Sequence, residues 1–114
     1  MNNRDVLIKL HKALHDIIEL MGRDNGITRF PKFIFIYNQV SLALEDDETL
    51  NDLVFLEDIK RMISGMYSGT TGSFSDYGVW LDDKIERQKI NKEFNLLRDE
   101  LPKLASSLKT RQPE

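Results

Sequence analysis

The chain has 114 residues, no cysteine, 40% hydrophobic and 31% charged residues, and a formal net charge of −3. This size and balance are typical of one folded soluble domain with its own core, and the lack of cysteine excludes disulfides, thiolate metal sites and thiol nucleophiles. The polar start predicts no signal peptide, and the longest apolar run, 33–37, is too short to cross a membrane. We therefore expect a cytoplasmic protein that does not bind membranes.

The first half of the chain predicts two helices. Asn3 can cap the first, and the turn at Arg23–Gly26 should end it, because Asn and Gly tolerate a left-handed conformation. The second should begin at Pro31, which suits the first helical position. The run 33–37, FIFIY, could also form a strand, but the helical spacing of apolar residues continues beyond it and favours a helix. The two apolar stripes are Val6, Leu7, Leu10, Leu14, Ile17, Ile18 and Met21, and Phe33, Ile36, Tyr37, Val40 and Leu44.

Two further helices are predicted in the second half. The third should start at Asp46 or Asp47 and run to Tyr67. The fourth should start near Asp82 or Asp83, and Pro102 should kink or split it, because proline lacks a backbone donor. Residues 109–114 should form a frayed tail. The stripes are Leu53, Leu56, Ile59, Ile63 and Met66, and Ile90, Phe94, Leu97, Leu101, Leu104 and Leu108. The sum is an all-α, single-domain protein that resembles a four-helix bundle, with one long loop before the last helix.

That loop is expected at residues 68–81, and the stretch 67–80, YSGTTGSFSDYGVW, combines glycines, hydroxyls and aromatic rings. A phosphate-binding P-loop would need a lysine after its glycine, whereas Ser73 follows Gly72 and no base lies between Tyr67 and Asp83. The simplest interpretation is a structural loop, pinned to the bundle by Phe74 and Trp80. The alternative is that exposed aromatic residues anchor a protein partner, namely Tyr67, Tyr77 and Trp80.

The sequence shows no strong catalytic or metal-binding motif. His11 and His15 lie four residues apart and Glu19 follows one turn later, but two histidines without a clear third ligand are a weak zinc pattern. We expect both rings at the boundary of the apolar stripe. No GxSxG motif is present, and paired acids such as Asp82 and Asp83 are better explained as helix starts. We therefore expect no enzymatic activity and no cofactor.

Acidic residues are concentrated in one segment. Residues 45–58 carry a net charge of −7 and no base, whereas the parts before and after each carry +2. Such a segment disfavours nucleic acid and attracts basic partners. It is also consistent with acids placed at a helix N-terminus, and both interpretations can hold together.

One segment resembles a known family. Residues 59–80, IKRMISGMYSGTTGSFSDYGVW, resemble a small, functionally uncharacterised bacterial helical domain family with a Tyr-Gly-Gly-Met-Gly-Ser-Phe-Asn-Asp-like segment. The likeness extends over roughly residues 30–108; Thr70 and Thr71 depart from it, and Ser75 replaces its Asn. By analogy with other small acidic bacterial proteins, the resemblance implies a toxin-immunity protein. The matching positions are Tyr67, Gly69, Gly72, Ser73, Phe74, Asp76, Leu97 and Arg98.

These observations predict a protein-binding module, an immunity protein that occludes the active site of a cognate toxin. Its acidic segment would face a basic cleft and its aromatic residues would serve as anchors. Two alternatives stay open: a small-molecule-binding domain or enzyme that uses the 69–78 loop, and a homo-oligomer, for instance a homodimer through Ile34 and Phe35. The expected partner-binding residues are Glu45, Asp46, Asp47, Glu48, Asp52, Tyr67, Asp76, Tyr77 and Trp80.

Overall fold

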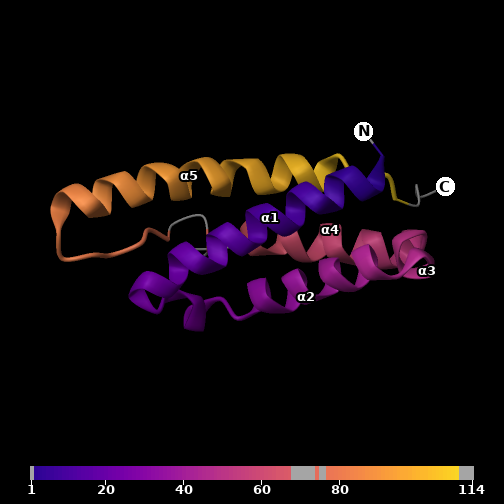
Figure 1. Ribbon diagram of the computed structural model, residues 1–114, viewed down its shortest axis with the longest axis horizontal. Helices are drawn as coiled ribbons and strands as arrows, with labels where there is room; N and C mark the ends of the chain where they lie inside the picture. Colours follow the sequence, from indigo (N-terminus) through magenta and orange to yellow (C-terminus); the bar gives the residue numbers. More distant parts are fainter. Residues whose placement is uncertain (1, 68–73, 75–76, 111–114) are drawn as a thin grey trace.

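A computed structural model describes residues 2–67, 74 and 77–110, and this part of the chain contains helices and no strand (Figure 1). The prediction of an all-α protein is therefore confirmed. None of the helices described is both long and apolar enough to cross a membrane. In chain order the elements are α1 (Asn3–Met21), the 3-10 turns η1 (Gly22–Asp24) and η2 (Gly26–Arg29), α2 (Lys32–Glu45), α3 (Asp47–Leu50), α4 (Leu53–Tyr67) and α5 (Lys84–Ser106).

The four long helices form an elongated bundle with extents of 48 × 29 × 23 Å. Helix α1 packs against α2 and α5, and α4 packs against the same two helices. The single turn α3 joins α2 to α4 at one end of the bundle, where the first turn of α1 also lies (Figure 1). The segment that leads into α5 lies at the opposite end (Figure 1).

Apolar stripes at helical spacing build the core, as predicted. Every residue of the α1 stripe is buried except Ile18, which is partly buried. The FIFIY run is helical, and its Phe33 and Ile36 face the core. The ring of Phe74 lies near the centre of an aromatic cluster that joins α2, α4 and α5. Its centroid is 4.5 Å from that of Phe33, 5.3 Å from Tyr67 and 5.6 Å from Phe94.

The helix boundaries differ from prediction in instructive ways. The predicted third helix is interrupted at Asn51 and Asp52, so that α3 and α4 are separate. The predicted split at Pro102 is wrong, since α5 continues to Ser106. Asn2 caps α1 in place of Asn3, because the Asn2 side chain accepts a hydrogen bond from the backbone of Asp5.

Asn3 instead holds the other end of the chain. Its side chain donates to the carbonyl of Lys109 at 2.9 Å and accepts from the amide of Lys109 at 2.8 Å. The Thr110 hydroxyl donates to Glu57. These contacts attach residues 109 and 110 to the bundle, and residues 111–114 of the predicted frayed tail lie outside the described part of the chain.

Candidate functional site

The acidic segment gathers at the turn between α2 and α4. Asp46 caps α3, because its carboxylate accepts from the backbone of Glu48 at 3.3 Å and from the hydroxyl of Thr49 at 2.7 Å. Asp52 caps α4 by accepting from the amides of Val54 and Phe55, both at 3.1 Å. Two of the predicted partner-binding acids therefore have a structural role, as expected for carboxylates at helix N-termini.

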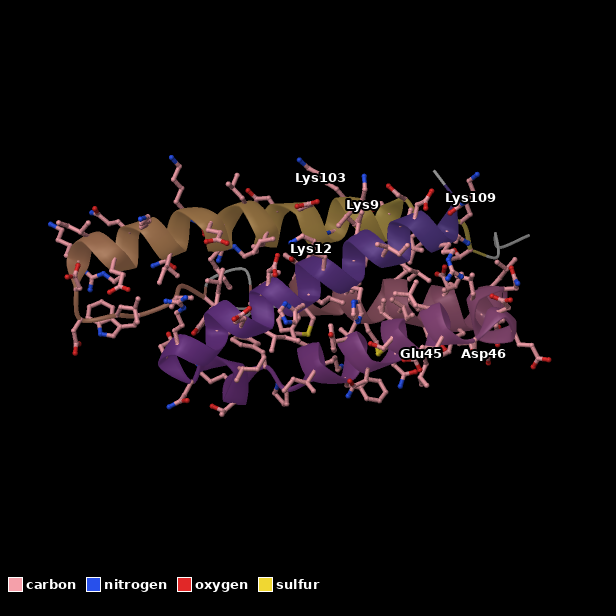
Figure 2. The ribbon with its side chains drawn as sticks, viewed as in Figure 1. Lys9, Lys12, Glu45, Asp46, Lys103 and Lys109 are labelled. Atoms are coloured by element: carbon pink, nitrogen blue, oxygen red, sulfur yellow. The ribbon has the colours of Figure 1, made fainter. Side chains whose placement is uncertain are left out.

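The other acids of this turn point into solvent. Glu45, Asp47 and Glu48 are exposed. Asp47 forms an ion pair with Arg4 at 3.9 Å, in which the Arg4 side chain is 53% exposed and the Asp47 side chain 90%. Such an exposed pair is worth little, so the turn keeps a negative field. Figure 2 shows Glu45 and Asp46 close to this end of the bundle.

Exposed apolar side chains border the acids. Leu42 is 51% exposed, Leu53 44% and Val54 55%. Exposed apolar side chains that lie close in the chain to exposed acids are more typical of a protein–protein interface than of a catalytic pocket. We define the acidic end as Glu45, Asp46, Asp47, Glu48 and Asp52.

The predicted aromatic anchors have different environments. Tyr77 is only 8% exposed, so its prediction as an exposed anchor is wrong. Tyr67 is partly buried, and its hydroxyl donates to the carbonyl of Arg98 at 2.6 Å; burial raises the pKa of this phenol. Trp80 is 63% exposed, with the Arg87 guanidinium 4.1 Å from its ring centroid. Asp76 lies outside the described residues.

The acidic end and the aromatic residues do not form one surface. The acids lie at the α3 end, and residues 77–83, which include Trp80, lie at the other end of the bundle (Figure 1). The expected combination of acidic steering and aromatic anchoring on one face is therefore not built. The sequence suggested that Phe74 and Trp80 pin the loop to the bundle. In the structure the Trp80 ring is exposed, and the buried rings are those of Phe74 and Tyr77.

A carboxylate that the sequence analysis did not single out holds the segment before α5. The Asp24 side chain accepts from the Tyr77 hydroxyl, from the Trp80 amide at 2.8 Å and from the Gly26 amide at 2.9 Å. Partial burial alone would raise the pKa of Asp24, but the hydrogen bonds from Tyr77, Trp80 and Gly26 outweigh it and hold this pKa below its ordinary value. The sequence Asp24-Asn25-Gly26 is a local signal for a turn, and Asn25 has the left-handed φ of 60° that such a turn requires. It gives no signal for the distant partners of Asp24, Tyr77 and Trp80.

Two side chains of α5 complete this attachment. Asn91 accepts from the Val79 amide and donates to the Val79 carbonyl, both at 2.8 Å. The Arg98 guanidinium donates to the Tyr77 carbonyl. Tyr67, Phe74 and Arg98 are thus packed in one cluster and have a structural role here.

The two histidines occupy the boundary between α1 and α2. His11 stacks on Tyr37 with 4.3 Å between ring centroids, and its Nε2 lies 2.8 Å from the Ser41 hydroxyl. Burial and the nearby His15 lower the pKa of His11. His15 lies with Asp16 and Glu19, the three offering ligand atoms within 4.8 Å of one another. His11 is outside this group, so the metal set suggested by the sequence, with both histidines and Glu19, is not assembled.

The surface is hollowed beside the start of α2. A groove of about 480 Å³ is lined by the cations Arg29, Lys32 and Arg61 and by apolar residues that include Phe30 and Met62. A smaller hollow of about 240 Å³ lies between α1 and α5, where its lining includes Lys9 and Lys12. Figure 2 shows these two lysines along the edge that α1 and α5 form.

Comparison with family models, with curated proteins and with solved structures gives no match for this chain.

Proposed function

We propose that this protein is a non-enzymatic, cytoplasmic binding module, an immunity protein that neutralises a cognate bacterial toxin by covering its active site. The observation that carries the proposal is the acidic end, a turn of exposed carboxylates that leads into α4, whose first residues, Leu53 and Val54, are also exposed. Toxins that act on nucleic acid or on nucleotides must attract anions, so their clefts are basic. A clustered set of carboxylates would speed encounter with such a cleft and fix its orientation.

The proposed binding surface consists of the acids whose side chains do not cap a helix. Asp47 and Glu48 lie on one exposed turn, and neither caps a helix. Because Asp46 and Asp52 hold the ends of α3 and α4, changing them would damage the turn itself. Trp80 lies at the other end of the bundle and is not part of this surface.

The test compares the wild-type protein with two double reversals. Asp47→Lys with Glu48→Lys reverses two acids of the acidic end and changes its formal charge from −5 to −1, and Glu93→Lys with Glu100→Lys reverses two exposed acids of α5 as a control. Each tagged protein is used to capture partners from cells of its native host, and a captured protein is then co-expressed with each variant in a growth assay. We expect capture and growth protection by the wild type and by the α5 control only.

The salt dependence of the association rate distinguishes electrostatic steering by the acidic end from a general loss of binding. Association of the wild-type protein with the captured partner should slow as salt is added, and the Asp47→Lys, Glu48→Lys protein should associate slowly at all salt concentrations. Equal protection by the acidic-end variant and the wild type would remove the acidic end from the mechanism. Failure of any variant to fold would be seen in its thermal melt.

A further inference from the structure

The outer face of α2 is unusually apolar for a face in contact with water. Ile34 is 45% exposed, Phe35 52% and Leu42 51%, and Asn38 lies exposed among them. No charged residue occurs in α2 between Lys32 and Glu45. Surface helices normally place charges opposite the core, so α2 has the composition of a helix that is covered on both sides.

The exposed apolar residues of α5 do not form such a face. On α5, Ile85 is 78% exposed and Leu96 66%, but they lie three turns apart on a helix that is rich in charge, KIERQKINKEFNLLRDELPKLAS. Single exposed apolar residues are normal on a protein surface. The α2 face is different because its apolar residues share one uncharged face of the helix.

The two ends of this face carry opposite charge. Lys32 lies at the N-terminal end, where Arg29 and Arg61 line the same groove. Glu45 lies at the C-terminal end and is followed by Asp46. Along one helix the order is therefore basic, apolar, acidic, a pattern that complements itself when the helix is turned end to end.

We propose that the outer face of α2 binds the same face of a second copy of this chain, with the two helices antiparallel about a two-fold axis. An isologous contact of this kind uses one self-complementary patch twice. In this arrangement Asn38 lies near the axis. Phe35 packs against Leu42 of the second copy, and Lys32 faces Glu45 of the second copy, so each pair occurs twice.

The charge order favours a second copy over an unrelated protein as the occupant. A toxin with a basic cleft would be repelled by Arg29, Lys32 and Arg61, whereas Glu45 at the C-terminal end of α2 in a second copy complements them. The groove of about 480 Å³ is lined in part by Lys32, so it can receive the Glu45 side chain of the second copy. The inference does not rest on toxin binding, since Asp47 and Glu48 belong to α3.

The expected dimer is reversible. A helix of 14 residues is about 21 Å long, and one helix from each copy makes an interface in the small class, below about 1,200 Å². Association should therefore depend on protein concentration. Sedimentation velocity and light scattering from micromolar to millimolar concentration measure it directly, on the full chain without any ligand.

Charge reversal provides the decisive test because the proposed pairs join different residues of two identical chains. Lys32→Glu alone and Glu45→Lys alone each place two pairs of like charges in the interface, and each should raise the dissociation constant about five- to tenfold. The protein that carries both substitutions restores opposite charges and should regain wild-type association. Lys84→Glu, at the exposed start of α5, is the matched control and should have no effect.

Substitution of the apolar residues gives an independent readout. Phe35→Glu should leave the protein monomeric throughout the concentration range, whereas Leu96→Glu on α5 should associate as the wild type does. Because both residues are exposed, thermal melts should show that both variants fold. The Asp47→Lys, Glu48→Lys protein should still dimerise, which separates this inference from the proposed toxin binding.

Three results would overturn the proposal. A wild-type protein that is monomeric at millimolar concentration would exclude the dimer, and loss of a captured partner in Phe35→Glu would then assign the face to another protein. Unchanged association of Phe35→Glu would place any dimer contact elsewhere. A double reversal that associates no better than Lys32→Glu alone would exclude the antiparallel arrangement.

Discussion

The Tyr67 hydroxyl donates a hydrogen bond of 2.6 Å to the backbone carbonyl of Arg98, the carbonyl that would accept from residue 102 in a regular helix. Residue 102 is proline and has no N–H to donate. A side chain of α4 therefore supplies the donor that α5 lacks, and α5 continues as one helix. The contact also joins the two helices at that level.

We predict a coupled effect of substitutions at these positions. Tyr67→Phe removes the donor and leaves a partly buried carbonyl unpaired, which should lower the free energy of unfolding by about 1–3 kcal/mol. In a Pro102→Ala background the new amide can bind the Arg98 carbonyl, so the same substitution should cost less. Urea unfolding of the four proteins of this double-mutant cycle measures the coupling; equal costs in both backgrounds would separate Tyr67 from Pro102.

Gly26 should tolerate no side chain. A Cβ at this position would lie 1.7 Å from the Tyr77 hydroxyl oxygen, so Gly26→Ala must displace Tyr77 from Asp24. We expect a loss of about 3 kcal/mol or more, from overpacking and a broken buried hydrogen bond. Gly22→Ala is the control, because no atom lies within 4 Å of its added Cβ and its φ is −68°; it should stabilise by about 0.4–1 kcal/mol. Thermal melts compare the two.

Asp24 should make stability sensitive to acid. Its folded-state pKa lies below its ordinary value of 3.8, so the unfolded chain takes up a proton first as the pH falls. The contribution is present above pH 3.8 and is lost as the pH falls through the folded-state pKa. Asp24→Asn should be less stable than the wild type at pH 7, and the difference should shrink towards pH 2 in urea unfolding. A constant difference over that range would contradict the proposed network.

His11 should add a second pH dependence nearer neutrality. Its folded-state pKa lies below the ordinary value of 6.5 because of burial and of the neighbouring His15. Stability is therefore full above pH 6.5 and falls as the pH drops from 6.5 towards the folded-state pKa, since only the unfolded state binds the proton there. His11→Gln should flatten this part of the profile. His15→Gln should reduce the slope without abolishing it, because burial is the larger cause.

Trp80 should contribute much less to the free energy of unfolding than Tyr77 does. Trp80 is 63% exposed and Tyr77 8%, so Trp80→Ala removes little buried surface beyond its contact with Arg87. We expect a loss below about 1 kcal/mol for Trp80→Ala and of about 3–5 kcal/mol for Tyr77→Ala, in line with truncation of a buried aromatic residue. Equal losses in urea unfolding would show that the indole is packed in solution.

The elements that local sequence determines were predictable, and those that depend on distant partners were not. Apolar spacing predicted the four long helices, and Asp83 caps α5 as expected, accepting from the Glu86 amide at 2.9 Å. Asp24 and Asn91 carry no local signal for their roles, because each binds backbone groups that only the folded chain brings near. The split predicted at Pro102 was wrong for the same reason, because the donor that replaces its missing N–H is the Tyr67 hydroxyl on α4.

At the acidic end, too, some features were predictable from the local sequence and others depend on the whole fold. The carboxylates were expected both as helix caps and as a partner surface, and the structure assigns capping to Asp46 and Asp52. Tyr77 was placed at the surface because aromatic residues in a glycine-rich loop resemble binding anchors. Burial depends on the whole fold, and only the structure shows that its ring packs 5.6 Å from that of Phe94.

The irregular segment at residues 77–80 has a consequence for how these molecules behave in a crowded solution. Unpaired backbone groups in a non-helical segment can pair with those of another chain and start an aggregate. Here the Tyr77 carbonyl is bound by Arg98, both backbone groups of Val79 by Asn91, and the Trp80 amide by Asp24. Side chains of the same molecule thus bind the backbone groups that a strand of another molecule would need. Few backbone groups of this segment are left for pairing between molecules.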